Sequence, residues 1–92
     1  MTNAIVLLRV SKDRINEVAE TIVDFEGVSE VYSLAGQYDL AAVIRARGDS
    51  QVASLVTEQI LKAEGILSSE TLIAFRAYSR YDLEHIFSIG MD

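Results

Sequence analysis

The sequence predicts an α+β domain with the element order βαββαβ. Two strand-like segments are each followed by an amphipathic helical segment. The stretches Glu26–Val28 and Glu64–Ile66 have similar sequences, and each is predicted to lie between the end of a helix and the start of a strand. Right-handed crossovers then favour the ferredoxin-like arrangement, a four-stranded antiparallel sheet with two helices on one face.

The first strand and helix follow from the spacing of apolar residues. Ala4–Val10 is aliphatic on both faces, which is typical of a strand that is covered on both sides. From Asp13 to about Phe25 the apolar residues recur at helical spacing. Ser11 or Asp13 is expected to cap this helix, and Gly27 lies where a left-handed residue commonly ends one.

The middle of the chain predicts an antiparallel hairpin. Its first strand is Val28–Leu34, with Val28 and Val31 on opposite faces. The turn Ala35–Tyr38 leads into the second strand, Asp39–Ala46. A connection this short joins antiparallel neighbours.

The last part of the chain predicts a helix, a long strand and a tail. The helix runs to about Ala63 and ends at Gly65, and Ile66–Tyr78 forms the fourth strand. Residues 79–92 form a tail with a short amphipathic helix, too short to be stable without packing. We therefore expect one domain over residues 1–78 and a separate helical tail over residues 79–92.

One face of the predicted sheet has no cover. Two helices shield a single face, yet the strands carry apolar side chains on both, and half of all residues are hydrophobic. A chain of 92 residues buries only about two-thirds of its surface. Uncovered apolar faces mark interfaces, so the sequence predicts a homodimer of the dimeric α/β-barrel type, formed by packing sheet faces together.

Composition disfavours several classes of function. The net charge is −6 and the eight Lys and Arg residues are scattered, which disfavours direct nucleic-acid binding. The chain has no cysteine and a single histidine, His85, so a tight metal site is not expected. The apolar run Ala4–Leu8 is too short for a signal-peptide core or a membrane span, so we expect a cytoplasmic protein that does not contact membranes.

No catalytic constellation is recognisable. His85 stands alone in the tail, the serines have no histidine in a known motif, and no glycine-rich phosphate loop is present. We therefore predict no enzymatic activity and no cofactor. An alternative is a small dimeric α/β-barrel enzyme of the monooxygenase or isomerase type. Such an enzyme needs polar groups between helices and sheet, which the two helical stripes do not offer.

The hairpin turn is the first candidate site. As a structural turn, it needs Gly36 for a positive φ angle and Asp39 to bond the turn backbone. As a ligand site, its backbone N–H groups would bind the carboxylate of a free amino acid, and Asp39 would bind the ammonium group. Tyr38 would supply an apolar wall and a hydroxyl. The residues alone leave both interpretations open.

The second candidate is the pair Ser69 and Thr71. These residues are two apart, so in a strand their hydroxyls point to the same face. They could bind a polar ligand, or simply reflect β-propensity and a cross-strand hydrogen bond.

These motifs together resemble a known family. Val31–Val43 resembles the core of the Lrp/AsnC ligand-binding domain, also called the RAM domain, with its strand, Gly-x-Tyr-Asp turn and second apolar strand. Gly65–Ile73 resembles the closing Gly-Val…Thr-x-Thr strand of that domain, with Ser69 in place of the first threonine. The resemblance covers residues from about 4 to 78.

The resemblance implies a regulatory sensor that binds a free amino acid or similar small effector between neighbouring dimers. Dimers of this family pack sheet faces together and assemble into rings, here an octamer or a decamer. The serine substitution removes a methyl group and leaves the choice of ligand open. By this resemblance the ligand site comprises Gly36, Gln37, Tyr38, Asp39, Ser69 and Thr71.

Typical members of this family carry an N-terminal helix-turn-helix, whereas here the first strand begins within a few residues of Met1. The chain thus resembles the stand-alone form of the domain. Its signal would then pass through other subunits or through full-length Lrp/AsnC regulators. A pure assembly partner of such regulators is a further alternative, and an ACT-like amino-acid domain of related topology is another.

Overall fold

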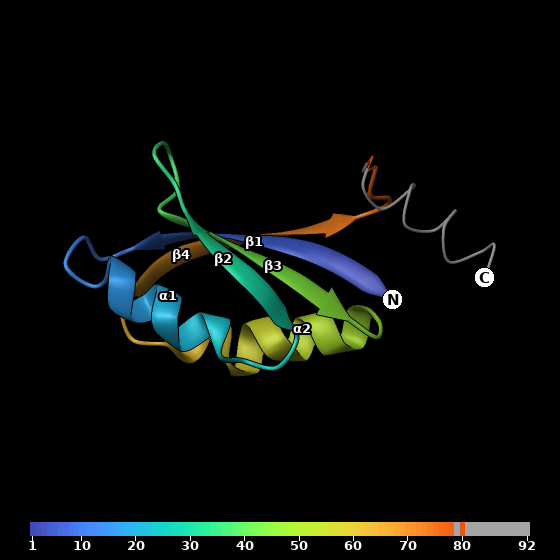
Figure 1. Ribbon diagram of the computed structural model, residues 1–92. Helices are drawn as coiled ribbons and strands as arrows, with labels where there is room; N and C mark the ends of the chain where they lie inside the picture. The colour runs from blue at the N-terminus through green and yellow to red at the C-terminus, as the bar shows by residue number, and fades with distance from the viewer. Residues whose placement is uncertain (79, 81–92) are drawn as a thin grey trace.

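The computed structural model describes residues 1–78 and residue 80, and it contains one four-stranded antiparallel sheet with the strand order β2-β3-β1-β4. Both α-helices lie on the same face of this sheet (Figure 1). The βαββαβ prediction is therefore confirmed. The elements are β1 (Thr2–Val10), α1 (Ile15–Val23), β2 (Val28–Ser33), β3 (Leu40–Ala46), α2 (Asp49–Glu58), the 3-10 helix η1 (Ile60–Lys62) and β4 (Ile66–Ala74).

Several element ends differ from the predictions. A turn in which the Arg14 N–H donates to the Ser11 carbonyl places Arg14 at the N-cap of α1, so the expected side-chain cap is wrong. The second helix stops at Glu58 and continues as η1. β4 ends at Ala74, before the predicted Tyr78. The predicted tail helix falls on residues 79 and 81–92, which lie outside the described residues, as does His85.

The core lies between the sheet and the helices. Alternate residues of β1 and β3 point toward the helices, and Val18 and Ile22 of α1 and Leu55 of α2 pack against them. Within the part of the chain that the structure describes, no polar or charged residue is buried. The fully buried large side chains are Val6, Leu8, Val10, Val18, Ile22, Leu40, Ile44 and Ile60.

An irregularity in β2 changes which of its residues face the core. Val28 pairs with Ile44, but the register shifts before Glu30, which pairs with Val43. This one-residue insertion breaks the alternation of side chains, as β-bulges do. Val28 and Val31 therefore both pack against the core, and the prediction that they lie on opposite faces is wrong.

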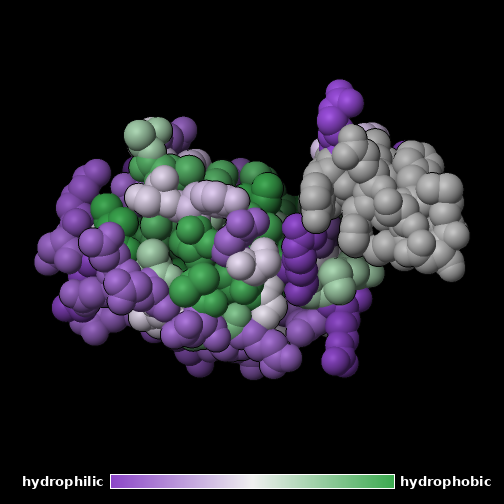
Figure 2. Space-filling view, in the orientation of Figure 1, coloured by the Kyte–Doolittle hydropathy of each residue, from purple (hydrophilic) through white to green (hydrophobic). Residues whose placement is uncertain are grey.

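The other face of the sheet, which we call the open face, is covered by neither α1 nor α2 (Figure 1). At its centre Ile5 of β1 is flanked by Val43 of β3 and Leu72 of β4. Ile5 and Leu72 remain 40% and 43% exposed. In Figure 2 hydrophobic residues gather around the sheet, and hydrophilic ones line the helical side. The apolar residues of the open face include Ile5, Leu7, Tyr32, Ala41, Val43 and Leu72.

Gly27 and Gly65 both adopt a positive φ, as predicted, but they lie directly before β2 and β4, three or more residues after the preceding helix has ended. Replacing Gly65 with alanine is expected to lower the free energy of unfolding by about 1–2 kcal/mol. The φ of Gly65 is +105°, and a Cβ there would lie 3.1 Å from Arg14 Cδ and 3.2 Å from Val18 Cγ2. Urea denaturation at fixed protein concentration measures this loss.

Gly48→Ala is the matched control for this variant. Gly48 has an extended backbone with φ of −171°, and an added Cβ would meet no atom within 4 Å. Its stability should stay within about 0.5 kcal/mol of the parent. Equal losses in the two variants would contradict the role assigned to the backbone conformation of Gly65.

Candidate ligand site

The turn between β2 and β3 lies at the end of the sheet where β1 ends and β4 begins, and it projects beyond the strands (Figure 1). The Leu34 N–H donates to the Asp39 carbonyl and closes the turn. The Asp39 N–H donates to the Leu8 carbonyl and ties the turn to β1. Gly36 has a φ of +152°, which side chains disfavour, so the turn needs glycine there.

Asp39 is held by the neighbouring strand and not by its own turn. Its Oδ2 accepts a hydrogen bond of 2.8 Å from the Val10 N–H. The β1–β4 register shifts between Arg9 and Val10, so the carboxylate supplies an acceptor where the strand ladder is irregular. Its Oδ1 lies 3.7 Å from Lys12 Nζ, and the Asp39 side chain is 16% exposed.

A depression of about 370 Å³ opens beside this carboxylate. Within residues 1–78, the N–H groups of Gly36 and Gln37 donate to no acceptor. The depression therefore offers free N–H donors and cations for an anionic group, and Asp39 Oδ1 for a cationic one. It is lined by Arg9, Val10, Lys12, Gly36, Gln37, Asp39 and Leu67.

Four residues of this lining were not anticipated from the sequence: Arg9, Val10, Lys12 and Leu67. A sequence pattern could have pointed to Arg9, because it is the one charged residue in the aliphatic strand β1. No local pattern points to Lys12 or Leu67, since their approach to the turn depends on how β1 and β4 pair. Gly36, Gln37 and Asp39 of the predicted site do line the depression together.

Tyr38, also predicted, reaches away from the depression toward β4. Its phenol Oη donates a hydrogen bond of 2.5 Å to Glu70 Oε1. This bond, then desolvation and the negative charge of Glu70, raise the pKa of Tyr38 above its ordinary value, while Arg9 opposes the shift. The phenol thus stays protonated at neutral pH and fixes the turn to β4.

Ser69 and Thr71 do not line the depression. Ser69 pairs with Leu8 and Thr71 with Val6, both of which face the helices. Opposed residues share a face of the sheet, so the two hydroxyls lie on the helical side of β4. Glu70 pairs with Leu7 on the open face. Within one chain the structure therefore does not bring the two predicted halves of the site together.

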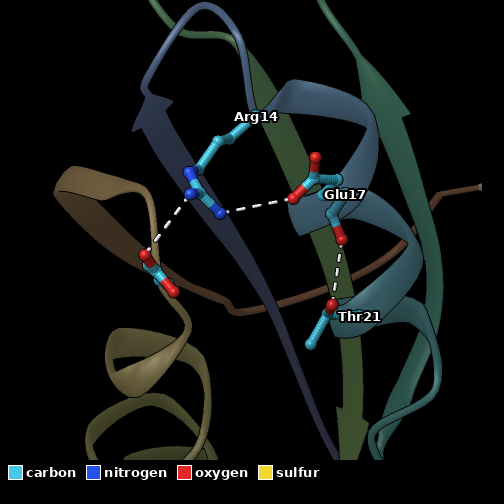
Figure 3. Close-up of polar contacts among 4 residues, drawn as sticks. Arg14, Glu17 and Thr21 are labelled. Carbon is cyan, nitrogen blue, oxygen red and sulfur yellow. Dashed lines mark hydrogen bonds and ion pairs between the residues drawn. The ribbon is translucent and has the colours of Figure 1, made fainter.

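A second depression lies between α1 and the segment before β4, and a salt-bridge network occupies it (Figure 3). The Arg14 guanidinium lies 3.3 Å from a Glu17 oxygen and 3.4 Å from a Glu64 oxygen. Thr21 Oγ1 donates to the Glu17 carbonyl over 2.9 Å. Because Arg14 is already paired with two carboxylates, this cluster connects the elements and offers no unpaired cation to an anionic ligand.

Among residues 1–78 and 80, no three His, Cys, Asp or Glu side chains are grouped to hold a metal ion. In the same part of the chain, no helix has the length and apolar character needed to cross a membrane.

A model of the Lrp/AsnC ligand binding domain matches residues 3–83. The chain therefore belongs to this family. An uncharacterized HTH-type transcriptional regulator of Pyrococcus furiosus is 34% identical over 77 residues, which cover 80% of the chain and 51% of the relative. The regulator YugG of Bacillus subtilis is 35% identical over 77 residues, 84% of the chain and 45% of the relative. The chain thus spans about half the length of these curated relatives.

Solved structures share the fold. TTHA0845 from Thermus thermophilus matches with a TM-score of 0.81 and 42% identity, over 87% of this chain and all of that one. The siroheme decarboxylase NirDL matches with a TM-score of 0.72 and 24% identity, over 98% of this chain and 34% of that one. This second likeness concerns the fold alone and shows that related folds also occur in enzymes.

Proposed function

We propose that the chain is a regulatory module of the Lrp/AsnC type that binds a free amino acid. The observation that carries the proposal is the depression beside the β2–β3 turn. Its lining includes Gly36 and Gln37, whose N–H groups donate to no acceptor within residues 1–78, and Asp39, whose Oδ1 forms only a loose ion pair with Lys12. Donors for a carboxylate and an acceptor for an ammonium group are the two elements that a zwitterion requires. The volume also suits a small molecule.

Assembly is the second part of the proposal. Two copies pack their open faces together, and such dimers associate into a ring, an octamer or a decamer. Ser69 and Thr71 face away from the turn of their own chain, so in the ring they line the site of a neighbouring copy. The protein acts in the cytoplasm without contacting DNA, and it passes its signal through its own ring or through full-length regulators.

A pure assembly partner is the competing function. The apolar open face alone would support it, since that face needs a partner whether or not a ligand binds. The two functions differ in whether the depression is used.

Calorimetry with the twenty amino acids tests the sensor function. At least one is expected to bind, and Asp39→Asn is expected to weaken that binding at least about tenfold, because asparagine loses the charge that holds the ammonium group. The asparagine oxygen still accepts from the Val10 N–H, so the fold should persist. Glu64→Gln, which removes a carboxylate remote from the depression, should bind like the parent. If no amino acid binds, the sensor function is wrong and the role as an assembly partner remains.

A further inference from the structure

The charges around the depression do not balance. Arg9 and Lys12 line it with positive charge, and Asp39 is the single acidic side chain in its lining. The depression therefore carries a net positive charge, although the whole chain carries −6. A ligand whose charges complement this set is favoured over one that leaves a cation unmatched.

Asp39 and Lys12 form a loose ion pair, with Nζ and Oδ1 3.7 Å apart. The Lys12 side chain is 89% exposed, so moving it costs little. A ligand ammonium group that approaches Oδ1 takes the place of Lys12 Nζ. Lys12 and Arg9 are then both free to bind anionic groups of the same ligand.

Nearby acidic groups do not remove this imbalance. Glu70 lies outside the lining of the depression and accepts the hydrogen bond from Tyr38. No ion pair of Arg9 exists within residues 1–78, whereas Arg14 is paired with two carboxylates. Arg9 is thus the cation whose charge a ligand can use.

We infer that the ligand is an acidic amino acid, with two carboxylates and one ammonium group. One carboxylate binds the N–H groups of Gly36 and Gln37, the ammonium group binds Asp39 Oδ1, and the second carboxylate binds Arg9 and Lys12. Site and ligand charges then cancel. A neutral amino acid leaves one cation unmatched, and a basic one leaves two. This inference rests on the proposed function and specifies the ligand of the same site.

Calorimetry with pairs of equal shape tests the inference. L-Glutamate and L-glutamine differ only in the charge of the side chain, as do L-aspartate and L-asparagine. One acid is expected to bind at least about tenfold more tightly than its amide at low salt. Arg9→Gln should lower this ratio several-fold, because Lys12 is then the one cation left in the lining for the second carboxylate. Arg47→Gln, which removes a cation from the far end of β3, should keep the ratio.

Each outcome decides a different claim. If the amides bind as tightly as the acids, the acidic specificity is overturned and the proposed sensor function stands. If no amino acid binds, the sensor function fails and the inference fails with it. If glutarate, which lacks the ammonium group, binds as tightly as L-glutamate, the depression is a plain dicarboxylate site and the amino-acid assignment is overturned.

Discussion

The Leu72→Asp variant is expected to be a monomer at concentrations at which the parent chain is a dimer. Leu72 lies beside Ile5 in the centre of the open face and is 43% exposed in a single chain. In the proposed dimer this side chain is buried against the second copy. An unpaired carboxylate there costs several kcal/mol per copy, so the dimer dissociation constant should rise at least about a hundredfold.

Sedimentation or light scattering across a concentration series measures this change. Leu61→Asp is the matched control, because Leu61 is 42% exposed but lies in η1 on the helical side. That variant should dimerise like the parent, and both should keep the circular dichroism of a folded chain. If Leu72→Asp still dimerises, or if Leu61→Asp dissociates equally, the open face is not the interface.

The Ile22→Ala variant is expected to lose about 3–4 kcal/mol of unfolding free energy. Ile22 is fully buried and is one of the α1 residues that pack against the sheet. Its truncation removes burial energy and leaves a cavity that the rigid layers fill only in part. A small domain has roughly 5–15 kcal/mol of stability in total, so this single change removes a large fraction.

Val23→Ala provides the comparison on the same helix. Val23 is 42% exposed, and alanine favours helix, so this variant should stay within about 0.5 kcal/mol of the parent. Urea midpoints must be compared at one protein concentration, because dimerisation adds to apparent stability. Similar losses in the two variants would contradict the placement of the core on the side of α1 that carries Ile22.

The order of elements could be predicted because local signals agreed with one another. The spacing of apolar residues predicted α1, and Gly27 and Gly65 marked the points at which the chain returns to the sheet. The faces of β2 could not be predicted, because the bulge before Glu30 adds a residue that no local pattern announces. A single such insertion exchanges the faces of all residues on one side of it.

The candidate site could be predicted only where its residues are neighbours in the sequence. Gly36, Gln37 and Asp39 are neighbours in sequence, and they line the depression together. Arg9 and Lys12 reach it only because β1 pairs with both β3 and β4, which is a long-range property of the sheet. Whether the six predicted residues bind a ligand stays a prediction that the calorimetry decides.

The two oxygens of Asp39 have different tasks, and this limits which amino acids position 39 tolerates. Oδ2 accepts the hydrogen bond of the Val10 N–H, and Oδ1 lies 3.7 Å from the Nζ of Lys12, which lines the depression. Alanine would leave a strand N–H without its acceptor, asparagine would keep that acceptor but lose the charge, and glutamate would be longer by one methylene. Substitutions at position 39 are thus opposed by the geometry of the sheet and, in the proposed sensor, also by the charge of the ligand.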